Sequence, residues 1–432
     1  MVPVGSGALT RSVPGPDDVA RFTLPNGMVL LVRENRASPS VVLTGSLEVG
    51  AYDEPRERAG LASFAADMLM RGTENRSFDE IYEALEAVGA SVGISGGTHT
   101  TGFGGRSLGE DLPLMLDVLA DCLRRPSFPQ DEVEKERGEI LADLAERAHD
   151  TRRMANLTFY ELAYPEAHPY AISLSGYPQT VEGIGRDDLE GFYARSYGAQ
   201  RMILVIVGAV DTEAVLEQVE AAFGDWEGQT MAREPLPDVP PITDVRRRTV
   251  TIPDKTQSDI VLGYPGPART HPQFLDARVC NTVLGVFGLM GRLGEKVRDE
   301  QGLAYSSYSR LSGGPGPGPW RMVAGVSPAN VERAVDSIRA EIGRMCEEPV
   351  GEEELKDCQA YLTGSMPLQL ETNSGVASSL LSMERYDLGL DYLQRYETLI
   401  YEVMPEGVQA AARRWLDPEA YALAIAGPPK DA

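Results

Sequence analysis

The histidines of the chain are the first residues to test for metal chemistry, because two imidazoles one helical turn apart can bind one zinc ion. There are four, and no two of them form an H-x-x-x-H or H-x-x-E-H pair: His99, His149, His168 and His271. The four cysteines are equally scattered and show no C-x-x-C spacing: Cys122, Cys280, Cys346 and Cys358. We interpret the cysteines as reduced core thiols of a cytosolic protein. The sequence therefore contains no histidine or cysteine pair with standard zinc-site spacing.

The segments that would position functional side chains alternate between predicted strands and helices. Alternating and continuous apolar runs predict strands within 21–35 and at 41–49 and 202–210. Apolar residues at helical spacing predict helices at 58–71, 78–88, 112–125 and 131–150. This mixture is typical of an α+β fold.

The second half of the chain repeats the first in the order and type of its segments. LEAVGASVGISGG in the first half corresponds to RDEQGLAYSSYSRLSGG in the second, so that Gly89 aligns with Gly302, and Val133 aligns with Leu355 further on. We therefore predict a duplicated α+β fold, in which each half has a mostly antiparallel sheet with packed helices. The expected parts are a flexible tail (1–16), an N-terminal domain (17–226), a linker rich in proline and charge (227–247) and a C-terminal domain (248–432).

Composition excludes some partners. The chain has 432 residues and a formal net charge of −25, which would repel a nucleic-acid backbone. Its apolar residues, 42% of the total, are periodic rather than continuous, and no run approaches the ~18 apolar residues of a membrane span. We see no signal-peptide pattern at the N-terminus. We expect a cytoplasmic protein with a large core that binds neither nucleic acid nor membrane.

One phrase of the first half carries a family resemblance. GLASFAADMLMRGT at 60–73 resembles G-L-A-H-F-x-E-H-M-L-x-x-G-T of the pitrilysin/insulinase metallopeptidase family, in its mitochondrial processing peptidase-like branch. The resemblance extends over nearly the whole chain and implies a two-domain, LuxS-like and processing-peptidase-like fold. The other residues that define this family pattern match. Ser63 and Asp67, however, replace the two zinc-binding histidines, and Ala66 replaces the glutamate that activates water.

The family's third ligand, a glutamate, corresponds to Asp143, which lies 76 residues after Asp67. We expect Asp67 and Asp143 to face each other across an empty pocket as solvated or hydrogen-bonded acids. A weak attraction for a hard cation stays open, with His99 as the one further candidate ligand. The resemblance thus implies no zinc in this chain and zinc in a partner subunit.

A second phrase resembles the substrate-holding part of the family. R-E-x-x-G-L-A-Y corresponds to RDEQGLAY at 298–305, so Arg298 and Tyr305 occupy the positions of an arginine and a tyrosine that hold substrate at the zinc of the peptidase half. Arginine offers a fork of donors to peptide carbonyls, and a tyrosine hydroxyl can stabilise a developing oxyanion. The segment 281–300 resembles the family's glycine-rich loop more weakly.

These resemblances together predict a non-catalytic subunit that supplies Arg298 and Tyr305 to a zinc-bearing homologous partner, and the pair would hydrolyse unstructured peptides. We expect no peptidase activity from the chain alone. Two alternatives stay open: a self-sufficient peptidase with a non-standard metal at Asp67, Asp143 and His99, and a structural or binding homodimer of the same fold. The sequence leaves open whether the chain forms a homodimer when alone.

Overall fold

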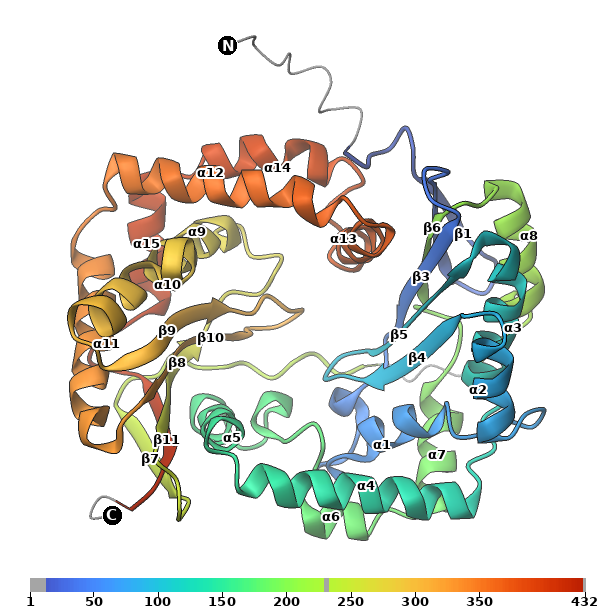
Figure 1. Cartoon of the computed structure of the whole chain (residues 1–432), viewed down its shortest axis with the longest axis horizontal. Helices are drawn as coiled ribbons and strands as arrows, with labels where there is room; N and C mark the ends of the chain where they lie inside the picture. Colours follow the sequence, from blue (N-terminus) through green and yellow to red (C-terminus); the bar gives the residue numbers. More distant parts are fainter. Residues whose placement is uncertain (1–12, 229–232, 430–432) are drawn as a thin grey trace. The chain divides into compact units, whose positions relative to one another are not determined.

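The computed structural model describes residues 13–228 and 233–429 (Figure 1). Most of the predicted tail, residues 1–12, and residues 229–232 of the predicted linker lie outside the described residues. The chain splits into two compact units. Unit 1 comprises Met1–Ala142, Ser173–Glu234 and Met366–Arg395, and unit 2 comprises Asp143–Ile172, Pro235–Ser365 and Tyr396–Ala432.

Unit 1 is built on a six-stranded mixed sheet with the strand order β1-β2-β6-β3-β5-β4. Its strands are β1 (Ala20–Thr23), β2 (Val29–Glu34), β3 (Ser40–Leu47), β4 (Ser91–Gly96), β5 (Thr101–Leu108) and β6 (Ile203–Gly208). The pairing of β2 with β6 is parallel and the other pairings are antiparallel. The helices that lie wholly in this unit are α1 (Leu61–Met68), α2 (Phe78–Glu86), α3 (Leu112–Arg124), α6 (Pro178–Glu182), α7 (Arg186–Ser196), α8 (Thr212–Phe223) and α13 (Asn373–Arg385).

Unit 2 is built on a five-stranded mixed sheet with the strand order β7-β11-β8-β10-β9. Its strands are β7 (Arg246–Thr251), β8 (Ser258–Pro265), β9 (Ala304–Leu311), β10 (Pro319–Val326) and β11 (Ala422–Gly427). The helices that lie wholly in this unit are α5 (Thr151–Ala163), α9 (Phe274–Gly285), α10 (Phe287–Leu293), α11 (Val331–Glu347) and α15 (Pro405–Trp415). Three helices cross from one unit to the other: α4 (Gln130–Ala148), α12 (Glu352–Gln369) and α14 (Tyr392–Tyr401).

The two sheets share one topology. If the strands β2 to β6 and β7 to β11 are each counted from one to five along the chain, both sheets have the order 1-5-2-4-3, with a single parallel pairing between the first and the fifth. Gly89 and Gly302, which the repeat aligns, both adopt positive φ, 66° and 61°, shortly before the edge strands β4 and β9. The predicted duplication and the α+β fold are confirmed.

The boundaries of the units cut across the predicted domains. Helix α5, from the first half of the sequence, packs on β8 and β11 of unit 2, and α13, from the second half, packs on β3 and β6 of unit 1 (Figure 1). Small side chains allow the first contact, because Ala155 and Ala163 of α5 lie in one buried cluster with three alanines of β11, Ala422, Ala424 and Ala426. Each half of the sequence therefore completes the core of the other unit.

No single helix in the described ranges is long and apolar enough to cross a membrane. The bent pair Phe274–Gly285 and Phe287–Glu300 meets the test of length and composition only. Most side chains of its first helix, α9, are buried within the protein.

Candidate functional site

The residues before helix α1, which carries the predicted zinc-site positions, define where the helix begins. It follows Gly60, whose φ of +96° is a left-handed conformation that favours glycine. The half-buried carboxylate of Glu54 accepts hydrogen bonds from the backbone N–H groups of Gly60 at 3.0 Å and Ala62 at 2.7 Å. These bonds satisfy N–H groups that a helix start otherwise leaves unpaired, so Glu54 stabilises the start of α1.

The face of α1 that carries the replaced residues packs against the edge strand β4. Ala66 is fully buried, whereas Ser63 and Asp67, one helical turn apart, are half-buried. A Cβ atom added to Gly96 of β4 would lie 2.7 Å from Ser63 Cα and 3.3 Å from Ala66 Cβ. The backbone of β4 therefore closes directly over this part of the helix.

Asp67 lies in a cluster of charges between α1 and the unit 1 part of α4. Burial raises the pKa of Asp67 to about 7; the carboxylate of Glu136 raises it further and Arg71 opposes the shift. Arg71 forms ion pairs with Glu136, with Glu139 at 2.6 Å and with Glu132 at 3.5 Å. The guanidinium of Arg71 is thus the cation that balances the carboxylates at this end of α1.

Asp143, expected as a solvated or hydrogen-bonded acid, is paired with Arg153 of α5. Its carboxylate accepts two hydrogen bonds from Arg153, at 3.0 and 2.6 Å, and this pairing holds the pKa of Asp143 below its usual value. The side chain is half exposed. The carboxylate that raises the pKa of Asp67 is that of Glu136. Asp143 is engaged by Arg153 from the next helix along the chain.

His99, the one further candidate ligand, lies in the loop between β4 and β5. Its ring packs near the ring of Tyr52, with 5.7 Å between centroids, and its backbone carbonyl accepts a hydrogen bond from Arg233 at 2.8 Å. Arg233 also pairs with Asp53 and stacks over Tyr52. His99 therefore belongs to a group of contacts that fixes Arg233 to unit 1.

Arg298 and Tyr305 lie close together in unit 2. Arg298 is on a π-helical segment (Gly294–Glu300), and Tyr305 is on the edge strand β9. Arg298 donates to Asp299 from Nε at 2.7 Å and from Nη2 at 3.1 Å. Asp299 is the main cause of the raised pKa of Arg298, and Tyr305 adds to it, which places the phenol near the guanidinium. Tyr305 itself is 93% exposed, unusual for a large aromatic side chain.

Sequence reasoning missed the charged residues that surround the predicted positions. Arg71 lies four residues after Asp67, and Glu136 lies seven residues before Asp143 on α4. The seven-residue spacing places Glu136 and Asp143 on one face of α4, so helical periodicity was the signal that would have found Glu136. Arg71 lies beyond Met68, the last residue of α1, and helical spacing did not identify it. Glu54 had no comparable signal, because it acts from the loop before α1.

The chain is similar to proteases over nearly its whole length. Residues 29–169 match the family model described as "Insulinase (Peptidase family M16)", and residues 183–362 match "Peptidase M16 inactive domain". An uncharacterized zinc protease of Streptomyces coelicolor is 30% identical, covering 98% of this chain and 92% of that protein. The chain belongs to peptidase family M16. A probable mitochondrial-processing peptidase subunit beta of Arabidopsis thaliana is 26% identical over 61% of this chain and 50% of that protein.

The M16 fold is also found among solved structures. The crystal structure of a peptidase M16 inactive domain from Pseudomonas fluorescens has a TM-score of 0.87 and 24% sequence identity, and covers 95% of this chain and 98% of that one. This likeness supports the two-domain M16 fold for the chain.

The zinc ion that the M16 family implies does not fit the residues of this chain. The hydroxyl of Ser63 is a poor zinc ligand, Ala66 has no titratable group, and the raised pKa of Asp67 keeps much of its carboxyl protonated near neutral pH. Within residues 13–228 and 233–429, no group of three or more His, Cys, Asp or Glu side chains is arranged to hold a metal ion. No reaction step at α1 is therefore assigned to zinc.

Proposed function

We propose that this chain is the zinc-less subunit of a two-chain M16 peptidase and that it supplies Arg298 and Tyr305 to a zinc-bearing homologous partner. One observation carries the proposal: the chemical positions of α1 are replaced and packed against β4, while the Arg298 and Tyr305 pair is retained and Tyr305 is presented to solvent. A chain with this combination would hold a peptide without cleaving it.

The two side chains suit complementary tasks on a peptide bond. Arg298 would donate to carbonyl oxygens of the bound peptide, and the hydroxyl of Tyr305 would donate to the carbonyl under attack, where negative charge develops. Arg298 now pairs with Asp299 near the surface. Such pairs contribute little free energy, so exchanging Asp299 for a peptide carbonyl costs little.

The edge strands offer a way to hold the peptide backbone. β4 and β9 each end a sheet, and a strand at an edge has backbone N–H and C=O groups on one side without a strand partner. An extended peptide can add to such an edge through main-chain hydrogen bonds. We therefore propose unstructured peptides as substrates, since only an unfolded segment presents its backbone in this form.

Co-purification from the native host tests the proposal. We expect a homologue that carries H-x-x-E-H to purify with this chain at one to one, and a fluorogenic peptide to be cleaved by the pair and not by either chain alone. Metal analysis should find zinc in the partner. Stoichiometric zinc and turnover by the purified chain alone would overturn the proposal in favour of a self-sufficient peptidase. A stable homodimer that never recruits a homologue would favour the structural alternative.

A further inference from the structure

Strand β9 is an edge of the unit 2 sheet, and its pairing with β10 is interrupted beside Tyr305. Between Ala304 and Ser307, two residues of β9 oppose one residue of β10, and Tyr305 is one of the two. Such a β-bulge bends the strand and redirects its side chains. From Ser307 to Leu311 the pairing is regular. An extended peptide that adds to this edge therefore finds an uninterrupted register on the Leu311 side of Tyr305.

Two arginines lie opposite each other in this regular part of the sheet. Arg310 of β9 is the register partner of Arg321 of β10. Directly opposite residues of an antiparallel pair point to the same face of the sheet, with Cβ atoms about 4.5–5.5 Å apart. Like charges at such positions repel each other, and an anion bound between them removes the repulsion.

Helix α5 holds Arg321 at this face. Nη1 of Arg321 donates to Oδ1 of Asn156, and the guanidinium lies over the ring of Tyr160, 5.4 Å from its centroid. The amide of Asn156 is itself fixed, because it donates to the backbone carbonyl of Arg152 at 2.8 Å. Nε of Arg321 is buried, whereas Nη2 is not and forms no hydrogen bond with the residues that the structure describes. Nη2 is therefore the donor that Arg321 offers on the face it shares with Arg310.

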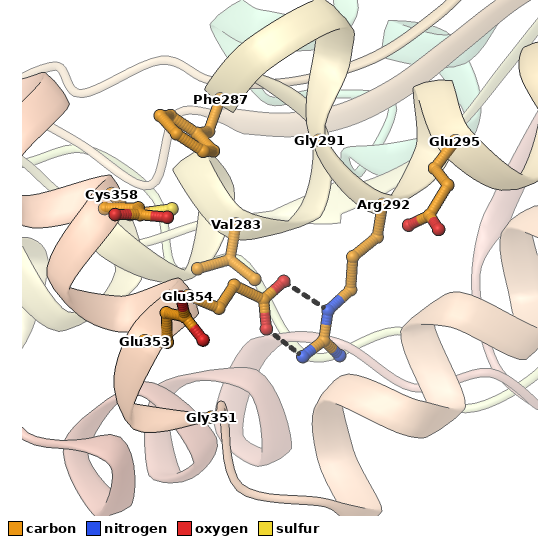
Figure 2. A pocket seen from close by; sticks show the side chains of 10 residues that line it. Val283, Phe287, Gly291, Arg292, Glu295, Gly351, Glu353, Glu354 and Cys358 are labelled. Atoms are coloured by element: carbon orange, nitrogen blue, oxygen red, sulfur yellow. Dashed lines mark hydrogen bonds and ion pairs between the residues drawn. The ribbon is translucent and has the colours of Figure 1, made fainter.

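A carboxylate pairs with another part-buried arginine of unit 2 but not with these two. In the pocket that Figure 2 shows, Arg292 donates to the carboxylate of Glu354 from Nε at 2.9 Å and from Nη2 at 2.6 Å. Arg310 is exposed and Arg321 is half-buried, and neither forms an ion pair within the described ranges of the chain. A partly buried cation without a counter-charge is unfavourable, so this face of β9 and β10 lacks an anion.

We propose that Arg310 and Arg321 form a subsite for the carboxylate of an aspartate or glutamate side chain of the bound peptide. The inference rests on the proposed function, because it names a residue class of that same substrate. A peptide residue that pairs opposite Arg310 directs its side chain to the face of both guanidinium groups. Arg310 follows Tyr305 by five residues, about 15 Å along a strand, so the acidic residue would lie about five positions from the bond under attack.

The charge of the whole chain acts against such a preference. A formal net charge of −25 repels an acidic peptide and, by itself, favours a neutral peptide over an acidic one. Tighter binding of the acidic peptide would therefore come from a local basic site. The sign of the effect distinguishes the subsite from the general charge of the protein.

Binding of matched peptides to the full chain tests the subsite. Two fluorescein-labelled peptides with amidated C-termini and no other acidic residue would differ at one central residue, glutamate or glutamine. Their affinities would be measured by fluorescence anisotropy at low and at high salt. We expect the glutamate peptide to bind about two- to fivefold more tightly at low salt, as for a partly exposed ion pair. This preference should shrink at high salt because the charges are screened.

Three variants locate the preference. Arg310→Gln should abolish the preference for glutamate, and Arg310→Glu should invert it, so that the glutamine peptide binds more tightly. Arg333→Gln removes an exposed arginine of α11 in the same unit and should preserve the preference. Circular dichroism spectra that match wild type would show that all three variants are folded.

The outcomes separate this inference from the proposed function. Equal or weaker binding of the glutamate peptide to wild type overturns the subsite and leaves the peptide-holding role standing. An equal loss of preference in Arg333→Gln assigns the effect to general surface charge and also overturns the subsite. If a glutamine peptide with a free C-terminal carboxylate binds more tightly than the amidated glutamate peptide, the site recognises a peptide end and the side-chain assignment is wrong. If no peptide binds, the proposed function fails and this inference fails with it.

Discussion

Strands β2 to β6 of unit 1 and β7 to β11 of unit 2 have the same order, but the candidate site residues differ in packing. Those of unit 1 pack against β4, and Tyr305 of unit 2 is exposed. In unit 1, α1 presents Ser63 and Ala66 to the closely packed backbone of β4, and the nearby carboxylates are balanced by Arg71. In unit 2, Tyr305 is exposed to solvent on the edge strand β9, and Arg298 pairs with its sequence neighbour Asp299. The unit 1 positions are packed within the protein, whereas Tyr305 of unit 2 is exposed.

The proposed function assigns the contact with another molecule to the exposed site of unit 2. Buried polar groups are stable only when they are paired inside the protein, and Arg71 pairs with the carboxylates of Glu132, Glu136 and Glu139 beside Asp67. A solvent-exposed tyrosine contributes little to folding, so a substitution of Tyr305 can test the proposed substrate contact without unfolding the chain. The following predictions test this contrast, beginning with the largest expected effect.

Loss of the exposed pair should remove most of the activity of the two-chain enzyme. Arg298→Ala and Tyr305→Phe are each expected to lower kcat/KM of the reconstituted pair by about 10²–10³-fold, the effect of removing one donor to a developing oxyanion. The melting temperature of the chain should stay unchanged, because both side chains lie near the surface. Arg333→Ala and Tyr401→Phe, at other exposed positions, are the matched controls. Full activity of both the Arg298 and the Tyr305 variant would show that this pair does not act on the substrate.

The close packing over α1 should make one glycine of β4 irreplaceable and another replaceable. Gly96→Ala would place a Cβ against the backbone at Ser63 and is expected to destabilise the chain by about 1–3 kcal/mol. Gly93→Ala meets nothing within 4 Å and should change stability by less than about 0.5 kcal/mol. Thermal melts of both variants test this. Similar melting temperatures would mean that the face of α1 has free space.

Asp67 should destabilise the fold progressively as pH rises. Its pKa is raised from 3.8 to about 7, so the folded state holds a proton that the unfolded state has lost, and stability falls between about pH 4 and pH 7. Asp67→Asn removes this penalty and should be more stable than wild type by about 1–3 kcal/mol at pH 8. The difference should shrink as pH falls toward 4. If the stability difference between Asp67→Asn and wild type did not vary with pH, the raised pKa of Asp67 would be wrong.

Asp143 should behave in the opposite way and more weakly. Arg153 lowers its pKa, so the ion pair contributes stability above the unfolded value of 3.8, and this contribution is lost as pH falls through the lowered pKa. Because the pair is half exposed and screened, Asp143→Asn should cost less than about 1 kcal/mol at neutral pH. Denaturant unfolding at neutral and acidic pH measures it. If Asp143→Asn lowered the free energy of unfolding by as much as Asp67→Asn raises it, the half-exposed environment of Asp143 would be wrong.

The sequence predicted the features that depend on local spacing. The repeat that aligned Gly89 with Gly302 is present as two sheets of one topology, and the four-residue spacing of Ser63 and Asp67 gave their common helix face. Spacing did not show which acid of α4 approaches Asp67. Glu136 and Asp143 are seven residues apart on one side of the helix, so helical periodicity does not distinguish them.

The exchange of helices between the halves had no local signal. An apolar stripe shows that a helix must be covered, but it does not identify the sheet that covers it. Helix α5 follows α4 directly in the chain, which favoured its assignment to the N-terminal domain. Its alanines fit the alanines of β11, more than 250 residues later. Complementary shapes over such a separation cannot be read from periodicity.

That exchange has a consequence for how the polypeptide withstands cleavage. A protease cut in the segment after α8 would produce two fragments, one still carrying α5 and the other still carrying α13. Each fragment would keep a piece of the other's interior, so we expect the nicked protein to elute as one species until denaturant is added. By the same reasoning, neither fragment should fold correctly when it is produced by itself.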